Sequence, residues 1–411
     1  MNEPTFYRRS TFIGGVLLAI TVVLLLILPV WISDSPYIMH LAITAFFYAI
    51  LAASWSHLAG YAGQFSFAHM AFMAIGASTA ALYGTYVRIT SAPTNLCREI
   101  PFFGNYLVLL DPIGVKQDNG LNCLDIAKQS MAAGTTIVTP SIWWGIIFGT
   151  LMGGLFGFLI GALVLRLRST YLALFTIGFS EIVRAILSAE IDVTQGQSGL
   201  EMSPLFPYGV TAFGQEFGVA DKVPPYYVML GLFLIVMLIL GWMVTSRIGL
   251  FIRAIREDEE AAAALGVHVV RYKVLVFTVT AMMAAAAGAV QGHYIGIITP
   301  NILIILQMSL VIAMAVIGGL ENIYAAAIGA ILLLFGLELL RTSFDIGPVT
   351  VDMTTWRLVF FGLLLMLTLR FFRNGLIYPI IVWLTRRGMD EETVAKRDAA
   401  AAAIEGGTDA A

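Results

Sequence analysis

The segment from Arg253 to Gly266 concentrates charged side chains within an otherwise apolar chain of 411 residues. It reads Arg-Ala-Ile-Arg-Glu-Asp-Glu-Glu-Ala-Ala-Ala-Ala-Leu-Gly, so carboxylates and guanidinium groups stand next to short alanines. Charged groups of this kind form hydrogen-bonded ion pairs with a complementary surface. Because the segment lies between two long apolar runs, it must meet water or another protein. It is therefore the first candidate for a functional contact.

This charged island is predicted to be one surface helix over 250–266, because no residue from Leu250 to Leu265 breaks a helix. A helical period places one broad apolar stripe on it, formed by Phe251, Ile252, Ile255, Ala262 and Leu265. The charged residues on or near the flanks of that stripe are Arg253, Arg256, Glu257 and Glu260. Gly266 is predicted to end the helix, since glycine readily adopts the left-handed conformation that closes one.

Residues for catalysis, metal binding or nucleotide binding do not form a recognisable pattern. No Lys follows a Gly, so the phosphate-binding loop Gly-x-x-x-x-Gly-Lys-Ser/Thr is missing. The histidines occur singly and without the spacing of metal ligands on one helix face: His40, His57, His69, His268 and His293. We expect no catalytic residue, no metal and no cofactor in this chain.

The amino-acid composition indicates whether the chain folds in water or in a lipid bilayer. Hydrophobic residues make up 59% and charged residues 12%, about half the roughly 25% charged residues of a soluble domain. The sequence therefore indicates an integral membrane protein. Its net charge of -3 offers no electrostatic basis for binding nucleic acid.

Windows of about 20 apolar residues predict an all-α, polytopic transmembrane helical bundle with about ten membrane segments. The windows are 12–32, 37–57, 67–87, 141–165, 170–190, 226–246, 273–297, 302–320, 322–341 and 355–372. We interpret the first as a retained helix and not as a cleaved signal peptide, since no small-x-small site follows it. Over 297–325 a re-entrant pair is the alternative to two full spans.

The distribution of Lys and Arg predicts the orientation. Most of these residues fall in the segments that lie inside when both termini are cytoplasmic, as the positive-inside rule requires. This places the island at 250–266 in the cytoplasm and the loop at 88–140 in the periplasm. That loop contains Cys97 and Cys123. A disulfide between them and two unpaired thiols both stay open.

Glycine spacing predicts close packing between helices, because small residues let helix backbones approach in lipid. One such repeat is Gly149, Gly153, Gly157 and Gly161, and a second is Gly76, Ala80 and Gly84. Two charged pairs fall within or beside predicted spans and are spaced to neutralise themselves. These pairs are Glu181 with Arg184 and Glu338 with Arg341.

Polar and small residues also gather between the second and third windows. Gly60, Gly63, Gln64, Ser66 and His69 fit an interrupted helix whose polar groups face a translocation pathway. An ordinary interfacial turn that satisfies its own backbone is the equal alternative.

Glu260-Ala261-Ala262, three further residues and Gly266 match the Glu-Ala-Ala-x-x-x-Gly core of the coupling loop in bacterial ABC importer permeases. The proline found downstream in many of these permeases is missing from Val276–Val279. The island and its flanks resemble the LivM/LivH permease family of branched-chain amino-acid importers. The same holds for Gly60-Tyr61-Ala62-Gly63-Gln64-Phe65-Ser66-Phe67-Ala68-His69, for 165–174 and for 194–199.

This resemblance implies a single permease domain, which we expect over 1–390. The Ala-rich tail over 391–411 lies outside the resemblance and is expected to be disordered and cytoplasmic. The resemblance also implies a multi-pass protein of the bacterial inner membrane, with the island as a cytoplasmic coupling helix. The implied partners are a second LivH-type permease, two cytoplasmic ABC ATPases that bind ATP, and a periplasmic substrate-binding protein. The implied cargo is a branched-chain amino acid, or a related solute such as urea or an amide. An ion- or proton-coupled secondary transporter is the alternative, and a structural membrane subunit is a third reading.

Overall fold

The structure is a computed structural model. It describes residues 5–32, 35–89, 99–102, 105–109, 137–138, 141–164, 169–207, 209–212, 215–341, 344–346, 349–351, 353–372 and 375–380. Cys97, Cys123 and the tail 391–411 lie outside the described residues, so the disulfide and the disordered tail stay predictions.

Each of the ten apolar windows contains a helix. The helices are α1 (Thr5–Ile32), α2 (Pro36–Ser56), α3 (His69–Thr85), α5 (Ile142–Val164), α6 (Ser169–Ala189), α8 (Val223–Thr245), α11 (Val269–Ile295), α12 (Ile305–Gly318), α13 (Ile323–Leu339) and α14 (Met353–Phe371). The predicted helical class is therefore confirmed.

Fewer of the described helices qualify as membrane spans than the ten apolar windows predict. Five described helices are long and apolar enough to cross a membrane alone, and a sixth span results if α12 and α13 count as one broken span. These two helices meet at a bend of 118°. The 14 residues of α12 extend about 21 Å, less than the roughly 30 Å of a hydrocarbon core. The count of ten membrane spans stays a prediction. The bend between α12 and α13 agrees with the re-entrant pair, which was the alternative stated for 297–325.

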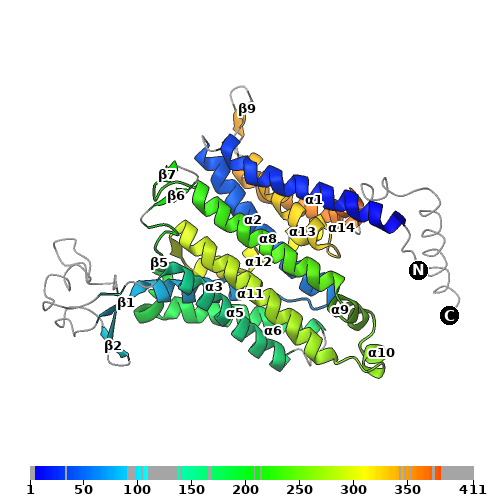
Figure 1. The fold of residues 1–411 in the computed structure, drawn as a ribbon, viewed down its shortest axis with the longest axis horizontal. Coiled ribbons are helices and arrows are strands. Elements are labelled where there is room, and N and C mark those ends of the chain that lie inside the picture. Colours follow the sequence, from blue (N-terminus) through cyan, green and yellow to red (C-terminus); the bar gives the residue numbers. More distant parts are fainter. Residues whose placement is uncertain are drawn as a thin grey trace.

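Two helices occupy the centre of the bundle (Figure 1). α2 and α11 are the most buried spans and pack on each other. α8, α12 and α13 also pack on α2, whereas α3 and α5 pack on α11. This arrangement buries large side chains such as Trp55 and Phe277 completely.

The glycine repeat of α5 forms the closest helix contacts, as predicted. Gly149, Gly153, Gly157 and Gly161 are all buried. A methyl group at Gly153 would overlap with Ala285 of α11. In α3, Gly76 meets the backbone of Ala285 in the same way, but a methyl group at Gly84 would contact nothing within 4 Å. The second repeat therefore packs through Gly76 and Ala80, and no described residue makes such a contact at Gly84.

Short strands cap one end of the bundle. β2 (Glu99–Phe102), β3 (Asn105–Leu109), β1 (Tyr86–Ile89) and β4 (Ile137–Val138) form an antiparallel sheet in that order. β5 (Leu200–Glu201) pairs with β8 (Ile297–Ile298), β6 (Val210–Ala212) with β7 (Gln215–Phe217), and β9 (Phe344–Ile346) with β10 (Val349–Val351). Figure 1 shows these strands at one end, away from the charged island.

The charged island contains two helices, so the prediction of a single helix over 250–266 was wrong. α9 (Arg247–Glu257) and α10 (Glu259–Ala264) are separated by Asp258, whose backbone is extended with φ -154 and ψ 110. The Asp258 carboxylate accepts hydrogen bonds from the backbone N–H groups of Glu260 and Ala261, at 2.9 and 3.0 Å. Asp258 therefore serves as the N-cap of α10, a position that aspartate favours and that requires a non-helical backbone.

Candidate functional site

The island turns sharply away from the end of α8. Ser246 caps α9, since its hydroxyl accepts a hydrogen bond from the Ile248 N–H at 3.2 Å. Gly249 is buried against the last carbonyls of α8, and a Cβ there would overlap with the Val244 oxygen. The island is thus held against the membrane helices from its first turn.

The predicted apolar stripe packs on the bundle in part, since Phe251 is half-buried and Leu265 is exposed. Ile252, Ile255 and Ala262 are buried. Leu265 is 86% exposed, so its place on the buried stripe was wrong. The cause is the break at Asp258, which gives α10 a different helical phase from α9. Gly266 has φ +84, and the predicted helix end is confirmed.

Arg256 joins the island to two interruptions of the membrane helices. Its guanidinium donates a hydrogen bond to the Gly60 carbonyl, in a π-helical turn (His57–Tyr61) that follows α2. The same guanidinium forms an ion pair with Glu321, in the turn between α12 and α13. Gly63, at φ +65, lies close enough that a Cβ there would be 3.2 Å from the Arg256 side chain. One side chain therefore connects α9, the end of α2 and the bend before α13.

Two further cations of the island and its flank also face the chain itself. Arg253 lies over the Tyr61 ring at 5.8 Å and donates a hydrogen bond to the Val244 carbonyl at 2.9 Å. Lys273, at the start of α11, is buried and forms an ion pair with Glu259 of α10. The basic residues thus fasten both island helices to the bundle.

Two of the four acidic residues of the island are not held in this way, whereas Asp258 caps α10 and Glu259 pairs with Lys273. Glu257, Glu260 and Ala261 are exposed. Within the described part of the chain, no hydrogen bond or ion pair involves the Glu257 or Glu260 carboxylate. Together with Leu265, they present a small acidic surface with an apolar residue at its edge. We call Glu257, Glu260, Ala261 and Leu265 the island surface.

The segment from Gly60 to His69 interrupts the regular helix between α2 and α3, as predicted. Its polar side chains are buried and do not face an open pathway. Gln64, Ser66 and His69 are at most 2% exposed. The Trp55 indole donates to the Ser66 carbonyl at 2.7 Å. The side chains of Gln64 and His69 have no hydrogen-bond partner among the described residues. Buried polar groups without partners are rare, so this segment has unused hydrogen-bonding capacity inside the bundle.

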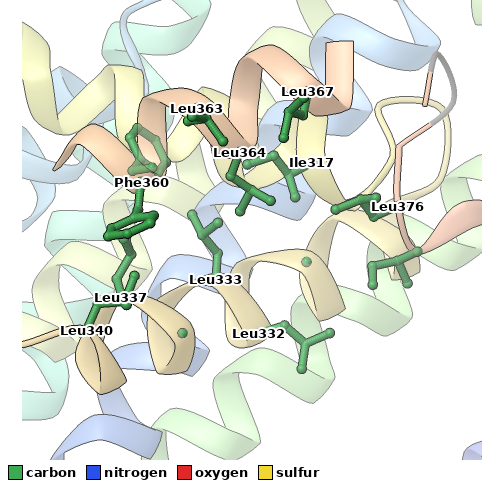
Figure 2. Close-up of a pocket in the computed structure, with 14 residues that line it drawn as sticks. Ile317, Leu332, Leu333, Leu337, Leu340, Phe360, Leu363, Leu364, Leu367 and Leu376 are labelled. Atoms are coloured by element: carbon green, nitrogen blue, oxygen red, sulfur yellow. The ribbon is translucent and has the colours of Figure 1, made fainter. Parts of the chain in front are cut away.

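Two further cavities lie elsewhere. One, of about 330 Å³, lies near the strands and includes His40, Asp221, Lys222, His293 and Tyr294 in its lining. The other, of about 380 Å³, is an apolar groove between α13 and α14 (Figure 2). Leucine and phenylalanine side chains dominate that groove, so it offers nothing to orient a polar solute.

Both charged pairs are formed as predicted. Arg184 and Glu181 lie 2.7 Å apart, and Arg341 and Glu338 lie 3.1 Å apart. Glu338 also accepts a hydrogen bond from the Tyr37 hydroxyl. Within the described residues, no group of three His, Cys, Asp or Glu side chains is arranged to hold a metal ion.

Sequence reasoning missed the partners of Arg256 and Lys273. Glu321 is the sole Asp, Glu, Lys or Arg between Lys273 and Glu338. A lone charge in so long an apolar stretch is a detectable signal, because such a residue needs a partner. The signal does not reveal which cation supplies it.

The fold and the island define a multi-pass helical membrane protein that exposes a charged helical element at one end. A family model described as "Branched-chain amino acid transport system / permease component" matches residues 37–369. The chain belongs to this family, so it is a transport permease by family and not an enzyme.

Curated relatives include both permease types of the resemblance. The high-affinity branched-chain amino acid transport system permease protein LivM is 32% identical over 216 residues, in Salmonella typhimurium and in Escherichia coli. The match covers 47% of this chain and 51% of each relative. The permease protein LivH of Escherichia coli is 28% identical over 179 residues, or 43% of this chain and 57% of the relative. The chain thus spans about half the length of these relatives. No solved structure matches.

Proposed function

We propose that this chain is a transmembrane subunit of an ABC importer and moves a small polar solute into the cytoplasm by alternating access. The supporting observation is the two-sided island. Its arginines contact the membrane helices and their connections, whereas the Glu257 and Glu260 carboxylates are exposed, as a docking element between the bundle and a separate ATPase requires. ATP would bind to that partner and not to this chain.

The island surface is the proposed contact with the ATPase. Exposed Glu257 and Glu260 suit a basic groove, and Ala261 permits close approach. Leu265 is an exposed apolar side chain that a partner would bury. Arg253 and Arg256 belong to the same coupling element but act on its inner side, toward Tyr61, Gly60 and Glu321.

The buried, irregular segment Gly60–His69 is proposed as the gate of the translocation pathway. In an alternating-access cycle, movement of Arg256 would displace the Gly60 turn and expose Gln64 and His69 to a passing solute. Their unused hydrogen-bonding groups would then meet ammonium, carboxylate or amide groups.

The assembly proposed is a heteromer in the bacterial inner membrane. A second LivH-type permease, two ATPases and a periplasmic substrate-binding protein complete it. The leading cargo is leucine, isoleucine or valine, by extension from the relatives, with urea or a short amide next. Binding measurements on the cognate substrate-binding protein would identify the cargo.

The docking role is tested by two variants, Glu260→Lys and Gly266→Pro. The matched control is Glu216→Lys, which lies at the end of the bundle that carries the strands. Lysine would repel a basic groove. Proline cannot adopt φ +84 and lacks the N–H that Gly266 donates to Ala263. We expect ATPase co-purification to weaken at least tenfold in both variants, with membrane insertion and the control unchanged. Unchanged co-purification in both variants would refute the assignment.

Transport in proteoliposomes separates this proposal from the secondary transporter. Uptake driven by ATP in the complete complex supports the importer. Uptake driven by an ion gradient in the absence of the ATPase would support the alternative. The paired states of Glu181 and Glu338 leave neither carboxylate as an isolated proton site.

A further inference from the structure

α6 differs from the other candidate spans in what it exposes. It is the least buried of the five, with 22% of its window inside the protein. Glu181 and Arg184 lie on its surface, with side chains 42% and 37% exposed. On α8, by contrast, the most exposed large side chains are apolar, at Ile235, Leu238 and Trp242.

The charged pair lies at membrane depth. Glu181 is 12 residues beyond Ser169 and 8 before Ala189, which places it roughly 18 Å and 12 Å from the two ends of the helix. Both distances are well inside a hydrocarbon core of about 30 Å. Charges at this depth face a bundle interior, a partner or a water-filled cavity, because contact with lipid is costly. The α6 surface is therefore not an ordinary lipid-facing surface.

A second, independent feature lies beside it. Before α12 the chain runs through a 3-10 turn (Pro300–Leu303) and the extended Ile304. Ile304, Ile305 and Leu306 are 42%, 48% and 60% exposed. Irregular backbone at membrane depth occurs where protein covers it or where it lines a water-filled cavity.

A hydrogen bond fixes the depth of this irregular segment. Gln307, two residues into α12, accepts from the Tyr48 hydroxyl at 3.3 Å. Tyr48 stands 12 residues after Pro36 and 8 before Ser56, near the middle of α2. The start of α12 is therefore deep in the bilayer and not at its surface.

The two features share one crevice and one face. The crevice is lined by Phe67, Ile177, Ser180, Glu181, Leu303, Ile305 and Met308. Next to it, a methyl group added at Gly178 would have no described residue within 4 Å. Farther around the exposed side of α6, Ile182 and Ile186 are 59% and 60% exposed. A small residue beside exposed apolar ones favours close contact with another membrane helix.

We infer that this α6–α12 face is the contact surface for the second permease subunit, and that Glu181 and Arg184 border the polar route between the two subunits. The inference rests on the proposed function and adds the surface at which the subunits meet. We choose a LivH-type chain as the occupant because a partner at this depth must itself be embedded in the membrane. LivM and LivH, both matched by this chain, are also distinct permeases of transport systems of the same name.

Photo-crosslinking in the assembled complex tests the surface. A benzophenone amino acid replaces Ile182, and the matched control replaces Leu238 on α8, which is 72% exposed. We expect the Ile182 probe to join the second permease in the membrane and the Leu238 probe to give lipid adducts. Lipid adducts alone at Ile182 would overturn the inference. A crosslink to a second copy of this chain would overturn the choice of occupant.

A charge exchange tests the role of the pair beyond self-neutralisation. The double variant Glu181→Arg with Arg184→Glu keeps the pair within α6 but reverses its polarity toward a neighbour. We expect transport to fall at least tenfold and co-purification of the second permease to weaken, with ATPase co-purification by this subunit retained. Full transport in the exchanged variant would mean that the pair serves α6 alone. Loss of ATPase binding in the Glu260 test, with the Ile182 crosslink retained, would refute the docking role and spare this surface.

Discussion

At the residue scale, Arg256 connects parts of the chain that are far apart in sequence. Its hydrogen bond to Gly60 and its ion pair with Glu321 use both arms of the guanidinium. Lysine has a single charged nitrogen and lacks the planar fork that spans two acceptors in fixed directions. This geometry makes Arg256 a positioning residue that acts between the island and the membrane helices.

We predict that Arg256→Gln lowers ATP-driven uptake at least tenfold and leaves ATPase co-purification unchanged, because the island surface stays intact. Loss of a charged hydrogen bond costs about 1.5–3 kcal/mol, so the turn at Gly60 would loosen. The measurement pairs uptake in proteoliposomes with co-purification. ATP hydrolysis that continues without uptake would be the expected signature, and full uptake would contradict the prediction.

Local sequence signals predicted some residues of the site well. Gly266 and the pairs Glu181–Arg184 and Glu338–Arg341 depend on neighbours within a few positions, and each was found where expected. The contacts of Arg256 depend on residues 196 and 65 positions away. No local pattern encodes such a pairing. A continuous helix was predicted because no residue from Leu250 to Leu265 breaks a helix, and the N-cap role of Asp258 was missed.

At the scale of elements, the glycines of α5 determine how closely helices approach. Their packing followed from the four-residue spacing, since small residues on one face are what close contact in lipid requires. The break between α12 and α13 did not follow from hydropathy, because both segments are apolar. Gly319, at φ +140, directly follows α12, and the Asn322 side chain caps α13, so the bend of 118° lies at a helix stop followed by a helix start.

We predict that Gly153→Ala destabilises the protein, whereas Gly231→Ala does not. Both changes add one methyl group within a helix, so the effect on helix propensity is matched. The added group overlaps with Ala285 at Gly153 but has nothing within 4 Å at Gly231. Overpacking of this kind costs about 1–3 kcal/mol. Thermal melts in detergent would show a lower midpoint for Gly153→Ala alone, and equal midpoints would contradict the packing assignment.

At the scale of the molecule, strands cap one end of the bundle and the island lies at the other (Figure 1). This polarity agrees with the distribution of Lys and Arg in the sequence. Which end faces the cytoplasm follows from that distribution alone and is open to a direct test.

We predict opposite accessibility for Leu265→Cys and Val219→Cys, made in a background with Cys97→Ser and Cys123→Ser. Both parent side chains are exposed, at 86% and 52%, so a membrane-impermeant maleimide distinguishes the sides. In intact spheroplasts, Val219→Cys should react and Leu265→Cys should react only after permeabilisation. The reverse pattern would invert the orientation and remove Leu265 from reach of a cytoplasmic ATPase.

The extended residue Asp258 is the joint between the two helices of the island, α9 and α10. On one side of it, α9 is tied through Arg256 to the end of α2 and the bend before α13. On the other side, α10 is tied through Glu259 to Lys273 at the base of α11. A partner that binds both α9 and α10 would therefore contact one element tied to α2 and one tied to α11. Rotation of α9 relative to α10 about Asp258 would slide α2 against α11. A single rigid helix would instead displace α2 and α11 in the same direction.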